Sequence, residues 1–109
     1  MVKKQASKIV KDFIKAVKQK DIRVEVAVLF GSYAHNKENE DSDIDIAVIS
    51  PDFGKDFVNE SILLKKISMA IDYDISPRPY SLEEYQKATE GDFLYQEIIK
   101  KGKLIKTSD

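Results

Sequence analysis

The sequence contains no cysteine and only one histidine, and these two shortages exclude several kinds of site. Without cysteine, the chain can form neither a disulfide framework nor a thiolate metal site. With one histidine, a single chain cannot assemble a cluster of imidazole ligands. A bound metal would therefore be held by oxygen atoms, which favours Mg²⁺, Mn²⁺ or Ca²⁺ over zinc.

Long apolar runs are also missing. No segment approaches the roughly 18 apolar residues of a membrane span, and the N-terminus lacks the apolar region of a secretory signal. We therefore expect a cytoplasmic protein that does not bind membranes. The length of 109 residues is typical of one domain, so we expect residues 1–109 to form a single domain.

Charged residues are abundant but unevenly placed. Residues 1–20 carry seven lysines and one acid, whereas residues 38–60 carry eight acids and one lysine. The lysines could in principle contact a nucleic-acid backbone. However, no surface aromatic lies among them for base stacking, because Phe13 falls on the apolar stripe of the same segment. A solvated helix face is the better interpretation, and we do not expect direct nucleic-acid binding.

The spacing of apolar residues predicts an alternation of helices and strands. We expect helices at about 3–19, 56–70 and 92–101, with another beginning at the Ser81–Glu84 capping box and a short one near residues 32–35. In the helix at 56–70, the candidates for burial include Phe57, Ile62, Leu63 and Ile67. We expect strands at 22–30, 43–50, 70–76 and 103–106, with Pro51 ending the second strand and Pro77 and Pro79 closing the third. This order indicates a single small α/β domain, with a short mixed central sheet covered by helices.

The segment LFGSYAHNKENEDSDIDIAVIS, residues 29–50, carries the most specific chemistry. Gly31 and Ser32 stand where a strand turns toward a helix, which is a phosphate-binding arrangement. Asp43 and Asp45 are two residues apart on a strand, so their side chains point the same way and repel each other. A divalent cation removes that repulsion, so the segment predicts a metal–nucleotide site.

A calcium EF-hand loop is the alternative interpretation of the acidic segment, but it fails in detail. With Asp41 at position 1, Ile46 stands where that loop needs glycine and Asp52 where it needs glutamate. The flanking pattern is also that of a strand, whereas an EF-hand loop lies between helices.

Residues 31–48, GSYAHNKENEDSDIDIAV, resemble the nucleotidyltransferase signature of the DNA polymerase β superfamily. The length and element order are similar to those of the minimal nucleotidyltransferases (MNT proteins), which are antitoxins paired with a HEPN-domain partner. The resemblance implies transfer of AMP from ATP to a tyrosine of a HEPN toxin. It also implies two Mg²⁺ ions bound by Asp43, Asp45 and a third carboxylate, and a nucleotide bound by Gly31, Ser32 and Ser42.

The resemblance leaves two points open. The third carboxylate is expected on the third strand, where Asp72 is preferred and Asp74 is the alternative. Many family members have Ala-Arg-Gly after the Gly-Ser turn, whereas this chain has Ala34, His35 and Asn36. The arginine of that pattern is therefore lost, while asparagine can still adopt the left-handed conformation of the turn.

Other functions fit the same residues. The domain could be a catalytically weak or silent antitoxin that acts by binding its partner alone. It could also transfer a nucleotide to a small molecule or to RNA. The nucleotide-binding glycine and serine, together with the aspartates, favour an active enzyme over a silent binding module.

Overall fold

The computed structural model describes residues 6–31, 33, 43–105 and 107. Its centre is a four-stranded sheet with the strand order β3-β2-β1-β4. The strands are β1 (Val26–Phe30), β2 (Ile44–Ser50), β3 (Ile75–Ser81) and β4 (Lys103–Ile105). β1 is antiparallel to both β2 and β4, whereas β2 and β3 are parallel. The expected short mixed sheet is therefore confirmed.

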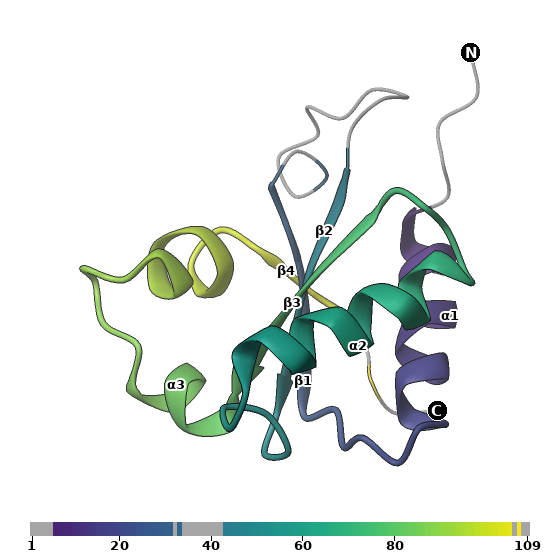
Figure 1. Cartoon of the computed structure of the whole chain (residues 1–109). Coiled ribbons are helices and arrows are strands. Elements are labelled where there is room, and N and C mark those ends of the chain that lie inside the picture. Colours follow the sequence, from purple (N-terminus) through teal and green to yellow (C-terminus); the bar gives the residue numbers. More distant parts are fainter. Residues whose placement is uncertain (1–5, 32, 34–42, 106, 108–109) are drawn as a thin grey trace.

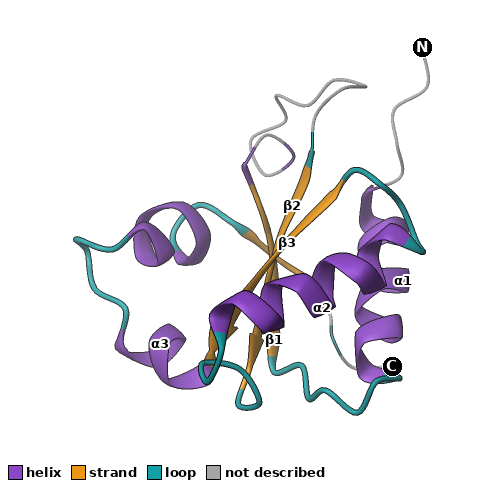
Figure 2. Cartoon of the chain, in the orientation of Figure 1, coloured by secondary structure: helices purple, strands orange, loops and turns teal. Residues whose placement is uncertain are grey.

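Helices cover both faces of this sheet. They are α1 (Ala6–Lys18), α2 (Phe57–Met69), α3 (Leu82–Lys87) and the π-helix η2 (Leu94–Ile99). Figure 1 and Figure 2 show α1 and α2 on one side of the sheet and α3 and η2 on the other. No helix among the described residues is long and apolar enough to span a membrane.

The apolar periodicity of α1 explains how it packs. Val10, Phe13, Ile14 and Val17 are buried, and they belong to one core cluster with residues of β1, β2 and α2. Full burial of a side chain of this size stabilises the fold by about 1.5–3 kcal/mol. The helix predicted at 3–19 is confirmed over the part that the structure describes.

β2 lies inside the sheet and is covered on both faces. Ile44, Ile46 and Val48 join the core beneath α1 and α2, whereas Ala47 and Ile49 join the core beneath η2. The strand ends at Ser50, directly before Pro51, as predicted. Asp45 is thus the one charged residue of an otherwise apolar or small-residue strand.

The third strand differs from its prediction. The strand expected at 70–76 begins only at Ile75, and it continues through Pro77 and Pro79 to Ser81. Tyr73, which lies within the span expected to be a strand, is 77% exposed. β3 is an edge strand. An edge strand can accept proline where the backbone N–H would point away from the sheet, because no hydrogen bond to a neighbouring strand is lost there.

The prediction for the buried side of α2 is also largely wrong. Phe57 and Ile62 are 60% and 48% exposed, and Leu63 is 39% exposed, whereas Ile67 is buried as expected. Leu64, which was not singled out, is completely buried. Apolar residues occur all round this helix, so their spacing does not select the side that packs.

The C-terminal part contains the predicted elements, although the helix expected at 92–101 is a shorter π-helix, η2. The Ser81–Glu84 capping box opens α3, a short final strand pairs with β1, and Gly102 follows η2. The N–H of Gly102 donates to the Ile98 carbonyl oxygen at 3.0 Å. A Cβ at Gly102 would overlap both Val28 and the backbone of η2, so the glycine allows close packing here.

Candidate active site

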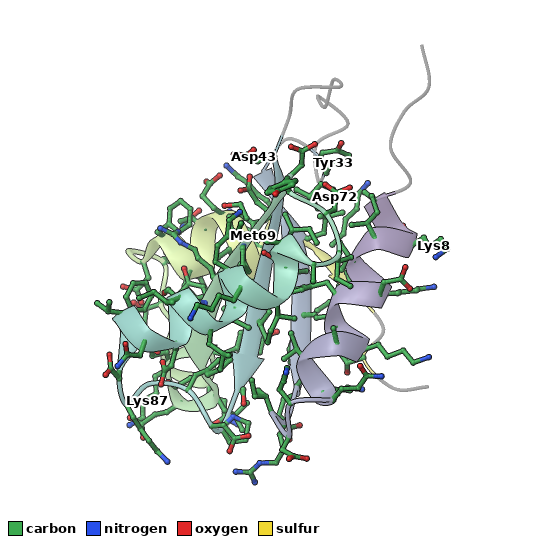
Figure 3. The ribbon with its side chains drawn as sticks, turned by 45° about the vertical axis from the view of Figure 1, so that its right-hand side comes forward. Lys8, Tyr33, Asp43, Met69, Asp72 and Lys87 are labelled. Carbon is green, nitrogen blue, oxygen red and sulfur yellow. The ribbon has the colours of Figure 1, made fainter. Side chains whose placement is uncertain are left out.

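The strand connections bring the two halves of the sequence motif together. β1 and β2 are antiparallel, so the end of β1 and the start of β2 lie at the same edge of the sheet, with Phe30 opposite Asp45. Gly31 follows β1 directly, and Asp43 directly precedes β2. Figure 3 shows Asp43, Tyr33 and Asp72 at this end of the molecule. Among these, Tyr33 is buried in the core.

Gly31 and Asp45 are in direct contact. Gly31 has a φ of +72°, a backbone conformation that residues other than glycine adopt only at an energetic cost. A Cβ built on Gly31 would overlap the Asp45 carboxylate. The turn that was predicted to hold phosphate therefore lies against a carboxylate that was predicted to hold metal.

The electrostatics of Asp45 fit a cation site. Its pKa is raised, first because burial disfavours the charged form and second because the Asp43 carboxylate repels it. The positive charge of Arg78 acts in the opposite direction. A divalent cation would relieve the repulsion between Asp43 and Asp45, so the donor set fits Mg²⁺.

Ser32 and Ser42, predicted to bind nucleotide, lie outside the described residues, as do His35 and Asn36 of the altered Ala-Arg-Gly segment.

Asp72 and Asp74, the two candidates for a third carboxylate, do not lie on a strand, contrary to the prediction. Asp72 and Asp74 both precede β3, and Asp72 Oδ1 accepts a hydrogen bond from the Asp74 N–H at 2.8 Å. The Asp74 carbonyl oxygen accepts from the N–H of Ile44 at 2.7 Å, which places the Asp74 backbone beside the start of β2. Within the described part of the chain, no three acidic or histidine side chains are grouped closely enough to form a metal centre.

The sequence interpretation missed Arg78 and Phe93. Arg78 is on β3 and Phe93 directly precedes η2, and the Arg78 guanidinium carbon lies 4.9 Å from the centre of the Phe93 ring. Phe93 also meets Phe30 edge to face, with ring centres 6.3 Å apart. Phe30 is the residue before Gly31, so this group borders the site. The Pro-Arg-Pro segment that contains Arg78 could have signalled an edge strand, but not its position beside Asp45.

A protein-family model and several solved structures resemble this chain as a whole. The family model described as Polymerase beta, Nucleotidyltransferase matches residues 12–109. A search of curated protein sequences gives no match.

Solved structures with similar folds include two toxin–antitoxin structures. One, crystallised with AMP-PNP, is 25% identical with a TM-score of 0.64, and the match covers 93% of this chain and 74% of that one. A mutant of the MntA–HpeT toxin–antitoxin is 23% identical with a TM-score of 0.62, over 90% of this chain and 73% of that one. A protein of Sulfolobus solfataricus assigned to the nucleotidyltransferases is 19% identical with a TM-score of 0.60, over 95% and 89% of the two chains.

Proposed function

Because the chain belongs to the polymerase beta nucleotidyltransferase family, we propose that it transfers AMP from ATP to a tyrosine hydroxyl of a HEPN-domain partner. The similarity to a toxin–antitoxin structure crystallised with AMP-PNP supports both the adenine nucleotide and the antitoxin role. The observation that carries the proposal is the contact between the Gly31 turn and the Asp45 carboxylate. It brings the turn proposed to bind phosphate next to the carboxylate proposed to bind metal.

Asp43 and Asp45 are the proposed ligands of a Mg²⁺ ion. Both supply oxygen atoms, and their mutual repulsion is relieved by a cation. When bound, the metal would neutralise negative charge on the phosphate oxygens. A second ion would need the third carboxylate.

We favour Asp74 over Asp72 as that third carboxylate. The Asp74 backbone is hydrogen-bonded to the first residue of β2, directly beside Asp43, whereas an Asp72 oxygen caps the turn between the two aspartates. Comparison of Asp72→Asn with Asp74→Asn tests this choice. Loss of transfer in Asp72→Asn alone would reverse it.

The proposed reaction is an in-line displacement at the α-phosphorus of ATP. The tyrosine oxygen forms a new bond to that phosphorus, the bond between the α-phosphorus and its bridging oxygen breaks, and pyrophosphate leaves. The hydroxyl proton passes to the third carboxylate or to water. The backbone at Gly31, together with Ser32 and Ser42, holds the phosphate chain, so the reacting atoms are positioned before the bond forms.

The test uses the whole chain with its HEPN partner, taken from the neighbouring reading frame, and Mg·ATP. We expect the mass of the partner to increase by one AMP unit with the wild-type chain and with Asp12→Asn, a carboxylate-to-amide control on α1. Asp43→Asn should fold but give no increase. Transfer retained by folded Asp43→Asn would exclude its role as a metal ligand. An unchanged partner mass with the wild-type chain would favour an antitoxin that acts by binding alone.

A further inference from the structure

We propose that Arg78 binds the phosphate chain of the nucleotide, and that Phe93 holds its guanidinium in place. The inference rests on the proposed function, since it names an additional ligand for the same triphosphate. Ser76 is opposite Asp45 and Arg78 is opposite Ala47, so Arg78 is the diagonal neighbour of Asp45 on the adjacent parallel strand.

Arg78 and Asp45 share one face of the sheet. Asp45 alternates with Ile44 and Ile46, which pack beneath α1 and α2, so it belongs to the face covered by η2. Arg78 belongs to the same face, because its guanidinium contacts Phe93, which directly precedes η2. Two residues along and one strand across amount to about 8 Å, which a long side chain can span.

Three groups interact with the Arg78 guanidinium. It lies over the Phe93 ring, and its positive charge acts on the Tyr80 hydroxyl and on the Asp45 carboxylate. Arg78 is nevertheless exposed, so its remaining N–H groups can reach a ligand. A guanidinium held on an aromatic ring loses little freedom when it binds phosphate, and it can donate two parallel hydrogen bonds.

The negative charge of the substrate would be partly balanced by a cation such as Arg78. A triphosphate remains anionic after it binds one Mg²⁺ ion, and the Asp43 and Asp45 carboxylates add further negative charge at its binding site. Of the described residues, Arg78 is the one whose positive charge acts on Asp45.

The pocket that is lined in part by Tyr80 does not offer an alternative phosphate site. It measures about 430 Å³ and is lined by Glu83, Glu84 and Asp92 against Lys87. This acidic lining would repel a phosphate chain. The excess negative charge of the nucleotide is therefore best matched by Arg78, at the edge of the site.

The test measures the affinity of the whole chain for Mg·ATP, for AMP and for adenosine. Arg78→Gln should weaken Mg·ATP binding at least about tenfold, the loss expected for a charged hydrogen bond, with a smaller effect on AMP. It should leave adenosine affinity unchanged, and Arg78→Lys should restore part of the Mg·ATP affinity. The matched control is Arg23→Gln, which removes an equal charge at the other end of β2, where Arg23 pairs with Asp52. This control should bind Mg·ATP as the wild type does.

Phe93 is tested as a positioning residue by a double-mutant cycle. Phe93→Leu should weaken Mg·ATP binding in the wild-type background and have no further effect in Arg78→Gln, since its role acts through Arg78. Additive losses, or a loss of adenosine affinity in Phe93→Leu, would instead make Phe93 a base-stacking residue and overturn its positioning role.

The failures of the two proposals are distinguishable. Wild-type chain that binds no Mg·nucleotide would overturn the proposed function and this inference together. Wild-type binding of Mg·ATP that is unchanged in folded Arg78→Gln would overturn the inference alone.

Discussion

Gly31 has only a hydrogen atom where any other residue would place a Cβ against the Asp45 carboxylate. Gly31→Ala should therefore displace Asp45 and also strain the backbone, because φ is +72°. We expect a loss of stability of at least about 1–2 kcal/mol, measured by urea unfolding, and a loss of Mg·ATP binding. Gly91→Ala is the matched control, because a Cβ there meets no atom within 4 Å. Equal behaviour of the two variants would contradict the contact.

Asp45→Asn should separate stability from function. Burial and the Asp43 charge raise the pKa of Asp45, so the ionised carboxylate is disfavoured in the fold. The amide should be more stable than the wild type at neutral pH, by an amount that solvent screening keeps small, while it abolishes metal-dependent nucleotide binding.

The pH dependence follows from the same shift. Because the pKa of Asp45 is higher in the folded state, wild-type stability should rise as pH falls through that raised pKa toward the ordinary value of 3.8. The advantage of Asp45→Asn should therefore be largest at neutral pH and disappear below pH 3.8. An advantage that persisted in acid would point to a cause other than ionisation.

At the scale of the elements, Ser81 has two roles, as the last residue of β3 and as the N-cap of α3. Its hydroxyl accepts from the Glu84 N–H at 2.9 Å, and the Glu84 carboxylate accepts from the Ser81 N–H at 2.9 Å. Ser81→Ala should cost about 1 kcal/mol in thermal or urea unfolding. Ser81→Asp, which keeps a capping oxygen, should recover most of it, and failure to do so would exclude the cap as the cause.

An ion pair fastens the chain before β1 to the turn after β2. Arg23 Nη2 lies 2.6 Å from Asp52 Oδ1, and the Arg23 backbone N–H also donates to Asp52. The hydrogen bond from the Arg23 side chain is the largest of the effects that lower the pKa of Asp52 to about 2. The stabilisation is therefore complete above pH 3.8 and is lost as pH falls through about 2. Arg23→Gln should be less stable than wild type at pH 7, and acid titration should remove the difference.

The elements also show where sequence reasoning succeeds. The periodic apolar stripe of α1 and the apolar character of β2 were enough to predict both elements, although β2 is buried on both faces rather than on alternate positions only. For β3 the strand expected at 70–76 was placed too early, because a strand at the sheet edge tolerates Pro77 and Pro79, which were expected to close it. For α2, apolar residues surround the helix, so only the tertiary structure selects Leu64 and Ile67 for burial.

The site was predictable to a similar degree. Gly31, Asp43 and Asp45 are close in sequence, so their pattern indicates a shared chemistry before the fold is known. Arg78 and Phe93 join them only through strand pairing and helix packing, which no local pattern encodes.

At the scale of the whole molecule, nucleotide binding should stabilise the fold by mass action. Mg·ATP at one hundred times its dissociation constant adds about 2.7 kcal/mol, which for a domain of this size raises Tm by roughly 10 °C or more. The shift should vanish with EDTA and in Asp43→Asn, as measured by differential scanning calorimetry. An equal shift without metal would contradict the role of the carboxylate pair.

The prolines of β3 affect whether molecules of this protein associate through their sheet edges in a concentrated solution. β3 forms one border of the sheet, and an exposed border normally offers a row of N–H groups on which a foreign strand can extend the sheet. Pro77 and Pro79 remove two of those donors from a seven-residue strand. This border is therefore protected against aggregation by strand addition, and a partner that docks there must use side chains rather than backbone pairing.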